Sequence, residues 1–160
     1  MANTNNNSIG DSPIIWPAKF VLMVIAEENT EAPSEEETMG FLESAFPILS
    51  TSDFANLHVS VVRAHQTCSN SKEEWDKVWD TFLSQLQTFK ISETFSVMKE
   101  IAQIYWLFKM EESMNEIMVN FTYRMSQYEQ YLQISKSDYR SILEEAKEIT
   151  GYNQFNEDDN

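Results

Sequence analysis

Two stretches of the chain repeat one pattern of apolar and polar positions, offset by 76 residues. Each has an apolar run, ending at Ile25-Ala26 or Ile101-Ala102, followed ten residues later by Glu36 or Glu112. The matching apolar positions are Val21, Leu22, Phe41, Leu42, Ala45 and Leu49 in one copy, and Val97, Met98, Ile117, Met118, Phe121 and Met125 in the other. This pattern predicts one unit used twice: a buried helix, a short loop, an acidic first turn and an amphipathic helix. Two facing copies would bury both apolar helices in a pseudo-twofold core.

Apolar spacing and capping residues predict an all-α, seven-helix single domain over residues 13–152. Residues 1–12 and the acidic tail at 153–160 are expected to be disordered. In the first half, helices are expected from about Ile14 to Glu28, from Ser34, and after Ser52. The helix at Ser34 has a capping box with Glu37, and Pro47 should shorten its end. In the second half, helices are expected from Ser71 (a second capping box, with Glu74), after Ser92, from Glu111 to Leu132, and from Ser135 to a cap at Gly151.

The composition favours a helical globular protein, and the net charge limits the classes of partner that it can bind. Hydrophobic residues make up 42% of the chain, which has only three glycines and four prolines. The net charge of −15 argues against binding to nucleic acid or to anionic membranes, because both need clustered cations. The same charge is compatible with cations, with basic partner surfaces, or with solubility alone.

Several features favour a reducing, cytoplasmic setting. Cys68 is the single cysteine, so no disulfide can form within one chain. The first residues, Met1 to Ser8, lack the basic region of a signal peptide. The longest apolar run, Phe20 to Ala26, is far too short to span a bilayer.

The segment from Glu27 to Glu37 contains six carboxylates, which can be interpreted in two ways. Helix-dipole stabilisation accounts for the three at the start of the second helix, but not for Glu27, Glu28 and Glu31. Those residues lie at or beyond the negative end of the first helix, and their oxygens could coordinate a divalent cation such as Ca²⁺ or Mg²⁺. The spacing is not that of an EF-hand. A solvated acidic loop and a cation site therefore both remain open.

Other candidate chemistry is weaker. His58 and His65 share a helix face, and Cys68 follows His65 at a spacing that could chelate zinc, but no second ligand pair is near in sequence. The aromatic and methionine residues are expected to form the core, with a partner-helix groove or a dimer seam as the alternative. No nucleophile motif, phosphate loop or dinucleotide fingerprint is present, so catalysis has no support.

The duplicated layout resembles the TerB family of tellurite-resistance proteins over about residues 15–150. The resemblance implies a buried helix ending in Ala, an acidic Asp-Gly loop and a later Glu, in both halves. Here that Glu is present as Glu36 and Glu112, whereas the family Asp falls on Asn29 and Tyr105. The family Gly falls on Thr30 and Trp106, so the second loop is expected to belong to the core. The run from Leu132 to Tyr139 is also similar to the family's closing segment.

Together these observations predict a non-enzymatic cytoplasmic component of a tellurite-resistance or metal-stress response, acting as an acidic protein-interaction module. Tellurite itself is an oxyanion that a chain of this charge repels, so an indirect role is expected. A protein partner is expected, with a homodimer possible and no nucleic acid. The first alternative is a divalent-cation sensor. The second is an enzyme whose active site the sequence does not reveal. The candidate metal ligands are Glu27, Glu28, Asn29, Glu31, Glu36 and Glu112.

Overall fold

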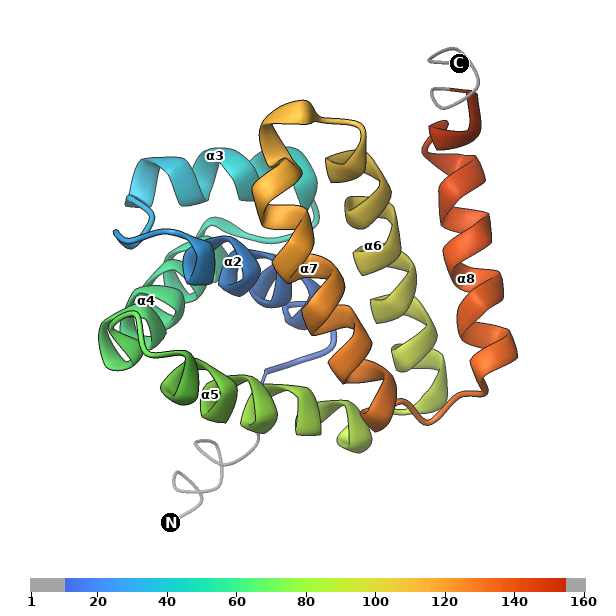
Figure 1. The fold of residues 1–160 in the computed structure, drawn as a ribbon, viewed down its shortest axis with the longest axis horizontal. Helices are drawn as coiled ribbons and strands as arrows, with labels where there is room; N and C mark the ends of the chain where they lie inside the picture. Colours follow the sequence, from blue (N-terminus) through green and yellow to red (C-terminus); the bar gives the residue numbers. More distant parts are fainter. Residues whose placement is uncertain (1–10, 155–160) are drawn as a thin grey trace.

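The computed structural model describes residues 11–154, and all of their regular secondary structure is helical, without strands (Figure 1). The α-helices are α2 (Trp16–Glu28), α3 (Glu35–Ala45), α4 (Thr51–Cys68), α5 (Lys72–Ser84), α6 (Ile91–Lys109), α7 (Asn115–Tyr128) and α8 (Lys136–Ile149). Three short 3-10 helices join them: η1 (Gln85–Thr88), η2 (Glu112–Met114) and η3 (Glu129–Tyr131). The all-α prediction is confirmed. The whole-chain count of seven helices and the internal duplication stay predictions. The termini expected to be disordered lie mostly outside the described residues.

Several helix ends follow the capping residues seen in the sequence. Ser34 and Glu37 form the expected reciprocal capping box at the start of α3. That helix ends at Ala45, two residues before Pro47, as the missing proline N–H requires. Ser135 caps α8, and Gly151 has a φ of 81°, the left-handed geometry that favours glycine after a helix.

Other boundaries differ from the prediction. The third helix is capped by Ser50 rather than Ser52, because Asp53 lies three residues after Ser50 and completes a capping box with it. Ser71 caps α5 as expected, but only the bond from the Glu74 N–H to its hydroxyl forms, not a full box. Capping by Glu93, which accepts from the Lys90 N–H, lets α6 begin at Ile91, just before Ser92.

The predicted helix from Glu111 to Leu132 is not continuous. The chain instead forms η2, the α-helix α7 and η3 in succession. A 3-10 turn at each end tightens the backbone where the chain reverses direction towards α7 and away from it. The central part of the prediction, including the apolar face of α7, is confirmed.

Helix α2 lies at the centre of the domain and packs against α4, α6 and α7. Nine of its thirteen residues are buried, as its nearly uniform apolar sequence predicts. Trp16 stacks on Phe82 of α5 with ring centroids 4.3 Å apart. Ala26 and Ala102, which end the two predicted buried runs, are both fully buried. Burial is confirmed for most of α2, whereas α6 buries seven of its nineteen residues along one side and leaves the other side exposed.

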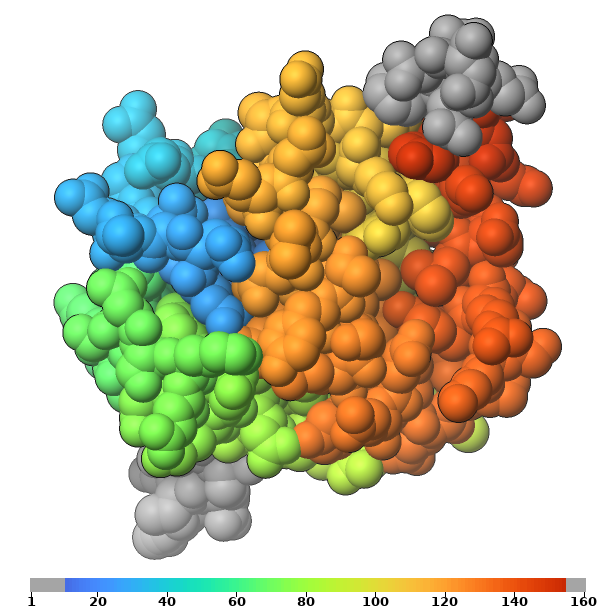
Figure 2. Space-filling model, viewed as in Figure 1, coloured from blue at the N-terminus to red at the C-terminus, as the bar shows by residue number. Residues whose placement is uncertain are grey.

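The remaining helices surround this centre. Figure 2 shows α7 on the front surface, with α5 on one side and α8 on the other. Helix α8 packs mainly against α6. It is also tied to α7 by a hydrogen bond of 2.7 Å between the buried hydroxyls of Tyr128 and Tyr139. No helix among the described residues is long and apolar enough to cross a membrane.

Candidate functional site

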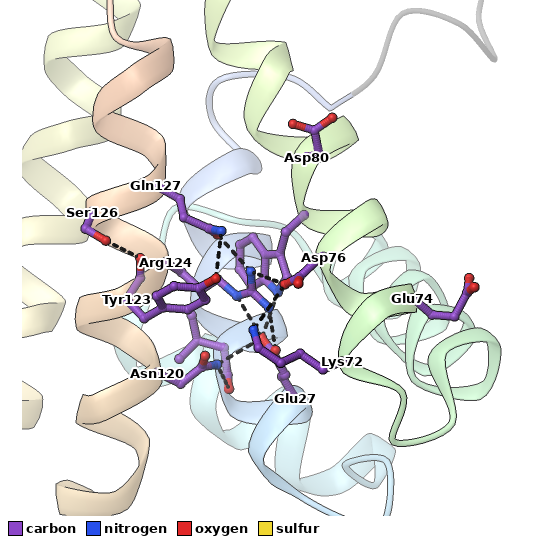
Figure 3. Close-up of polar contacts among 12 residues, drawn as sticks. Glu27, Lys72, Glu74, Asp76, Asp80, Asn120, Tyr123, Arg124, Ser126 and Gln127 are labelled. Carbon is purple, nitrogen blue, oxygen red and sulfur yellow. Dashed lines mark hydrogen bonds and ion pairs between the residues drawn. The ribbon is translucent and has the colours of Figure 1, made fainter.

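The first residue of the acidic segment, Glu27, points into the protein rather than into the loop (Figure 3). Its carboxylate accepts two hydrogen bonds from the Arg124 guanidinium, at 3.0 Å from Nε and 2.5 Å from the second terminal nitrogen. It also accepts from the Trp79 indole N–H at 2.8 Å and from the Asn120 amide at 3.0 Å. Glu27 therefore joins α2 to α5 and α7, and its lone pairs are largely used by protein donors.

Arg124 is also buried and bonded to other residues of the protein. Its side chain is 0% exposed, and its remaining terminal nitrogen donates to Asp76 at 3.1 Å and to Gln127 at 2.8 Å. The guanidinium carbon lies 5.1 Å from the Trp79 ring centroid and 4.9 Å from that of Tyr123. A buried guanidinium whose three nitrogens all have protein partners has little left to offer a ligand. We therefore assign this cluster a structural role.

The other predicted metal ligands do not gather around Glu27. Glu28, Glu31 and Glu36 are exposed, as is Glu112 on η2. Partial burial, together with the nearby charges of Glu27 and Glu116, raises the pKa of Glu28. Within residues 11–154, no set of three or more His, Cys, Asp or Glu side chains is arranged to hold a metal ion. The structure thus gives the cation site no geometric support.

The loop after α2 is shaped by bonds within the protein. The Asn29 amide donates to the Ile25 carbonyl at 2.7 Å, and the Asn29 carbonyl accepts from His65 Nε2 at 2.9 Å. His58 Nδ1 lies 3.2 Å from the Thr38 hydroxyl and links α4 to α3. Both histidines therefore join helices or loops. Cys68 is buried, and desolvation raises the pKa of its thiol.

A groove runs along α6, and none of the hydrogen bonds described above lies in it. One hollow of about 810 Å³ lies between the end of α3, the second half of α6 and the η2 turn. In Figure 1 the end of α3 passes behind this turn between α6 and α7. A second hollow, of about 630 Å³, lies between Ile14, Ile48 and the first half of α6. Both are lined by Glu100 and Gln103, so they meet there. We call the two together the α6 groove.

The floor and walls of the α6 groove are apolar and its margins are acidic. Exposed Leu107 and the partly buried Met110 and Met114 line one end, and exposed Ile14 and Ile48 line the other. Ionised groups lining the groove are three carboxylates, Glu93, Glu100 and Glu111, and one amine, Lys99. An apolar hollow with a net negative margin is suited to an apolar partner surface that also carries positive charge.

Glu100 is the charged group at the meeting point of the two hollows. It is partly buried, and desolvation raises the pKa of its carboxyl group. It forms no hydrogen bond or ion pair with other residues of the described chain. A carboxylate that has lost part of its hydration without gaining a protein partner is open to an incoming cation.

Sequence reasoning missed Arg124 and Glu100, although each leaves some signal. Arg124 falls at a core-facing position of α7, between Phe121 and Tyr128 at helical spacing, where a charge needs a buried partner. Glu100 follows the buried Val97 by three residues on α6. The pattern shows that it flanks the core, but only the fold shows that a groove passes over it.

Comparison of the chain with known protein families, with curated proteins and with solved structures found no match.

Proposed function

We propose that this protein is a non-enzymatic interaction module that binds a basic, partly apolar segment of another protein in the α6 groove. The observation that carries the proposal is the pairing of exposed apolar residues with carboxylates along one groove. Apolar area supplies affinity when it leaves water, and charge complementarity raises the association rate and rejects acidic partners. A second copy of this chain carries the same net charge of −15, which disfavours self-association.

The biological setting of this module remains a proposal drawn from the TerB-like pattern. A tellurite-resistance or metal-stress response is the context in which we would look for the basic partner. The protein would act there by holding another component rather than by chemistry on tellurite. Its charge disfavours an oxyanion, and its internal polar cluster is saturated by protein donors and acceptors.

The test is calorimetric titration with a basic amphipathic helical peptide, at low and at high ionic strength. We expect binding that weakens with salt, because salt screens the charges at the groove margin. Leu107→Ser and Ile48→Ser should each weaken binding by about fivefold, through lost apolar burial. Val119→Ser on α7 is the matched control, because Val119 and Ile48 are both 76% exposed and only Ile48 lines the groove.

Two outcomes would overturn the proposal. One is the absence of binding, and the other is equal weakening by the groove variants and by Val119→Ser. A parallel Ca²⁺ titration separates the interaction module from the cation sensor. Saturable Ca²⁺ binding that Glu36→Gln abolishes would favour the sensor, whereas we expect only weak, non-saturating association with the exposed carboxylates.

A further inference from the structure

The exposed side of α6 bears a regular stripe along its whole length. Its members are spaced alternately by three and four residues, and all of them line the α6 groove: Glu93, Ser96, Glu100, Gln103, Leu107 and Met110. Such alternation keeps successive residues on one face of a helix and is the spacing of a seam between two packed helices. The other sides of α6 are occupied, because they pack against α2, α7 and α8.

We propose that the partner segment is a single α-helix lying along this stripe, with a lysine or arginine that pairs with Glu100 at its centre. This proposal rests on the proposed function and names the partner's structure and its central residue. The stripe covers 18 residues, from Glu93 to the residue that caps α6, Met110, or about 25 Å at the rise of an α-helix. A partner helix of about 18 residues would therefore cover it.

The need for a cation follows from the position of Glu100. A docked helix would remove water from the point where the two hollows meet, and the carboxylate has no partner among the described residues. Burying it against an apolar residue would leave an unpaired charge, which is strongly unfavourable. A lysine or arginine at that point instead forms a charge-assisted hydrogen bond. Glu100 would thus select against helices that are apolar along their whole face.

The apolar ends of the groove indicate where the partner helix should carry apolar residues. Leu107 lies seven residues after Glu100, about 10 Å along α6, and Glu93 lies seven residues before it, in the hollow lined by Ile14 and Ile48. The partner should therefore carry large apolar residues two turns before and two turns after its central cation. Among the described residues, Lys99 is the one amine that lines the groove, so the partner's cation meets little repulsion there.

The experiment uses the full chain and two synthetic helical peptides of about 18 residues, a length set by the stripe. Both carry leucine two turns either side of a central position and have a basic outer face. One has lysine at the centre, and the other has norleucine, which keeps the carbon chain and lacks the charge. We expect the lysine peptide to bind the parent protein about tenfold more tightly than the norleucine peptide, as one charged hydrogen bond would give.

Glu100→Gln should remove this preference, so that the two peptides bind within about twofold of each other. Glu144→Gln is the control, because it removes the same charge from an exposed site on α8 outside the groove and should keep the tenfold preference. If the lysine preference is absent in the parent or survives Glu100→Gln, the inference about Glu100 is overturned while peptide binding still supports the groove. If neither peptide binds, the proposed function itself is overturned.

Discussion

Glu27 and Arg124 lie 97 residues apart in the chain and form a two-point ion pair that joins the central helix α2 to α7. The arginine is fully buried, while the glutamate side chain retains 12% of its exposure at the edge of the cluster. The pair is surrounded by donors and acceptors from Trp79, Asn120 and Asp76, so each charge is matched within the protein. Glu27, the first acid of the predicted cation loop, is thus used in contacts between helices.

Removing one member of this ion pair should destabilise the folded protein. We expect Arg124→Ala to lower the free energy of unfolding by about 3 kcal/mol, because it leaves Glu27 poorly solvated and without its cation. Urea denaturation measures the change. The control is Lys72→Ala, which removes an exposed ion pair of 3.5 Å with Asp76 and should cost less than about 1 kcal/mol. Equal losses in the two variants would show that the buried pair contributes no more than a surface one.

The buried alanines of α2 and α6 give a second prediction. Ala26 and Ala102 are fully buried, so the larger side chain of a leucine at either position would have to fit within the packed interior. We expect Ala26→Leu and Ala102→Leu each to destabilise the protein by about 1–3 kcal/mol through overpacking. Thermal unfolding followed by circular dichroism measures this. If both variants keep the parent midpoint, the paired buried helices expected from the sequence repeat are not a close contact.

The raised pKa of Glu100 predicts a pH-dependent stability. Desolvation favours the protonated carboxyl group in the folded state, so the stability contributed by this group is complete below its unfolded pKa, near 4.5. That contribution is lost as the pH rises through the folded value. Glu100→Gln, which mimics the protonated form, should therefore stabilise the protein at pH 7 and give no advantage at pH 3. Denaturation of both proteins across this range tests the sign, and a gain that is larger at pH 3 than at pH 7 would contradict it.

The tyrosine pair between α7 and α8 gives the last prediction. Burial raises the pKa of both Tyr128 and Tyr139, and their hydroxyls are hydrogen-bonded to each other. Tyr139→Phe leaves the buried Tyr128 hydroxyl unpaired and should cost about 1–3 kcal/mol. The double change to Phe removes both groups and should cost less than the sum of the two single changes. A double-mutant cycle in urea measures the coupling, and strict additivity would mean that the hydroxyl pair contributes nothing.

Local signals predicted the helices well because each depends on nearby residues. The Ser34–Glu37 capping box and the Gly151 cap are interactions within a few positions, so the sequence alone identifies them. Where two serines competed, at Ser50 and Ser52, the acidic residue three positions on decided the outcome. The all-helical class follows from such local rules together with the 3.6-residue apolar period.

The candidate site was less predictable because its geometry is set by distant contacts. Counting the carboxylates between Glu27 and Glu37 does not reveal that Glu27 turns inward, since Arg124 lies on another helix. Glu100 likewise appears as an ordinary surface acid on a buried helix until α3 and the segment around Ile48 are placed beside it. Met114 packs against the hydrophobic core, as expected, and it also lines the α6 groove together with Met110.

The central position of α2 has a consequence for biosynthesis. This helix is the most apolar of the fold, yet it leaves the ribosome before α4, α6 and α7, the helices that cover it. One hundred residues separate its last position, Glu28, from the end of α7 at Tyr128, which corresponds to about 5–20 s of translation. During that interval its apolar surface is uncovered, so the nascent chain should be a substrate for chaperones that hold exposed hydrophobic helices until α7 arrives.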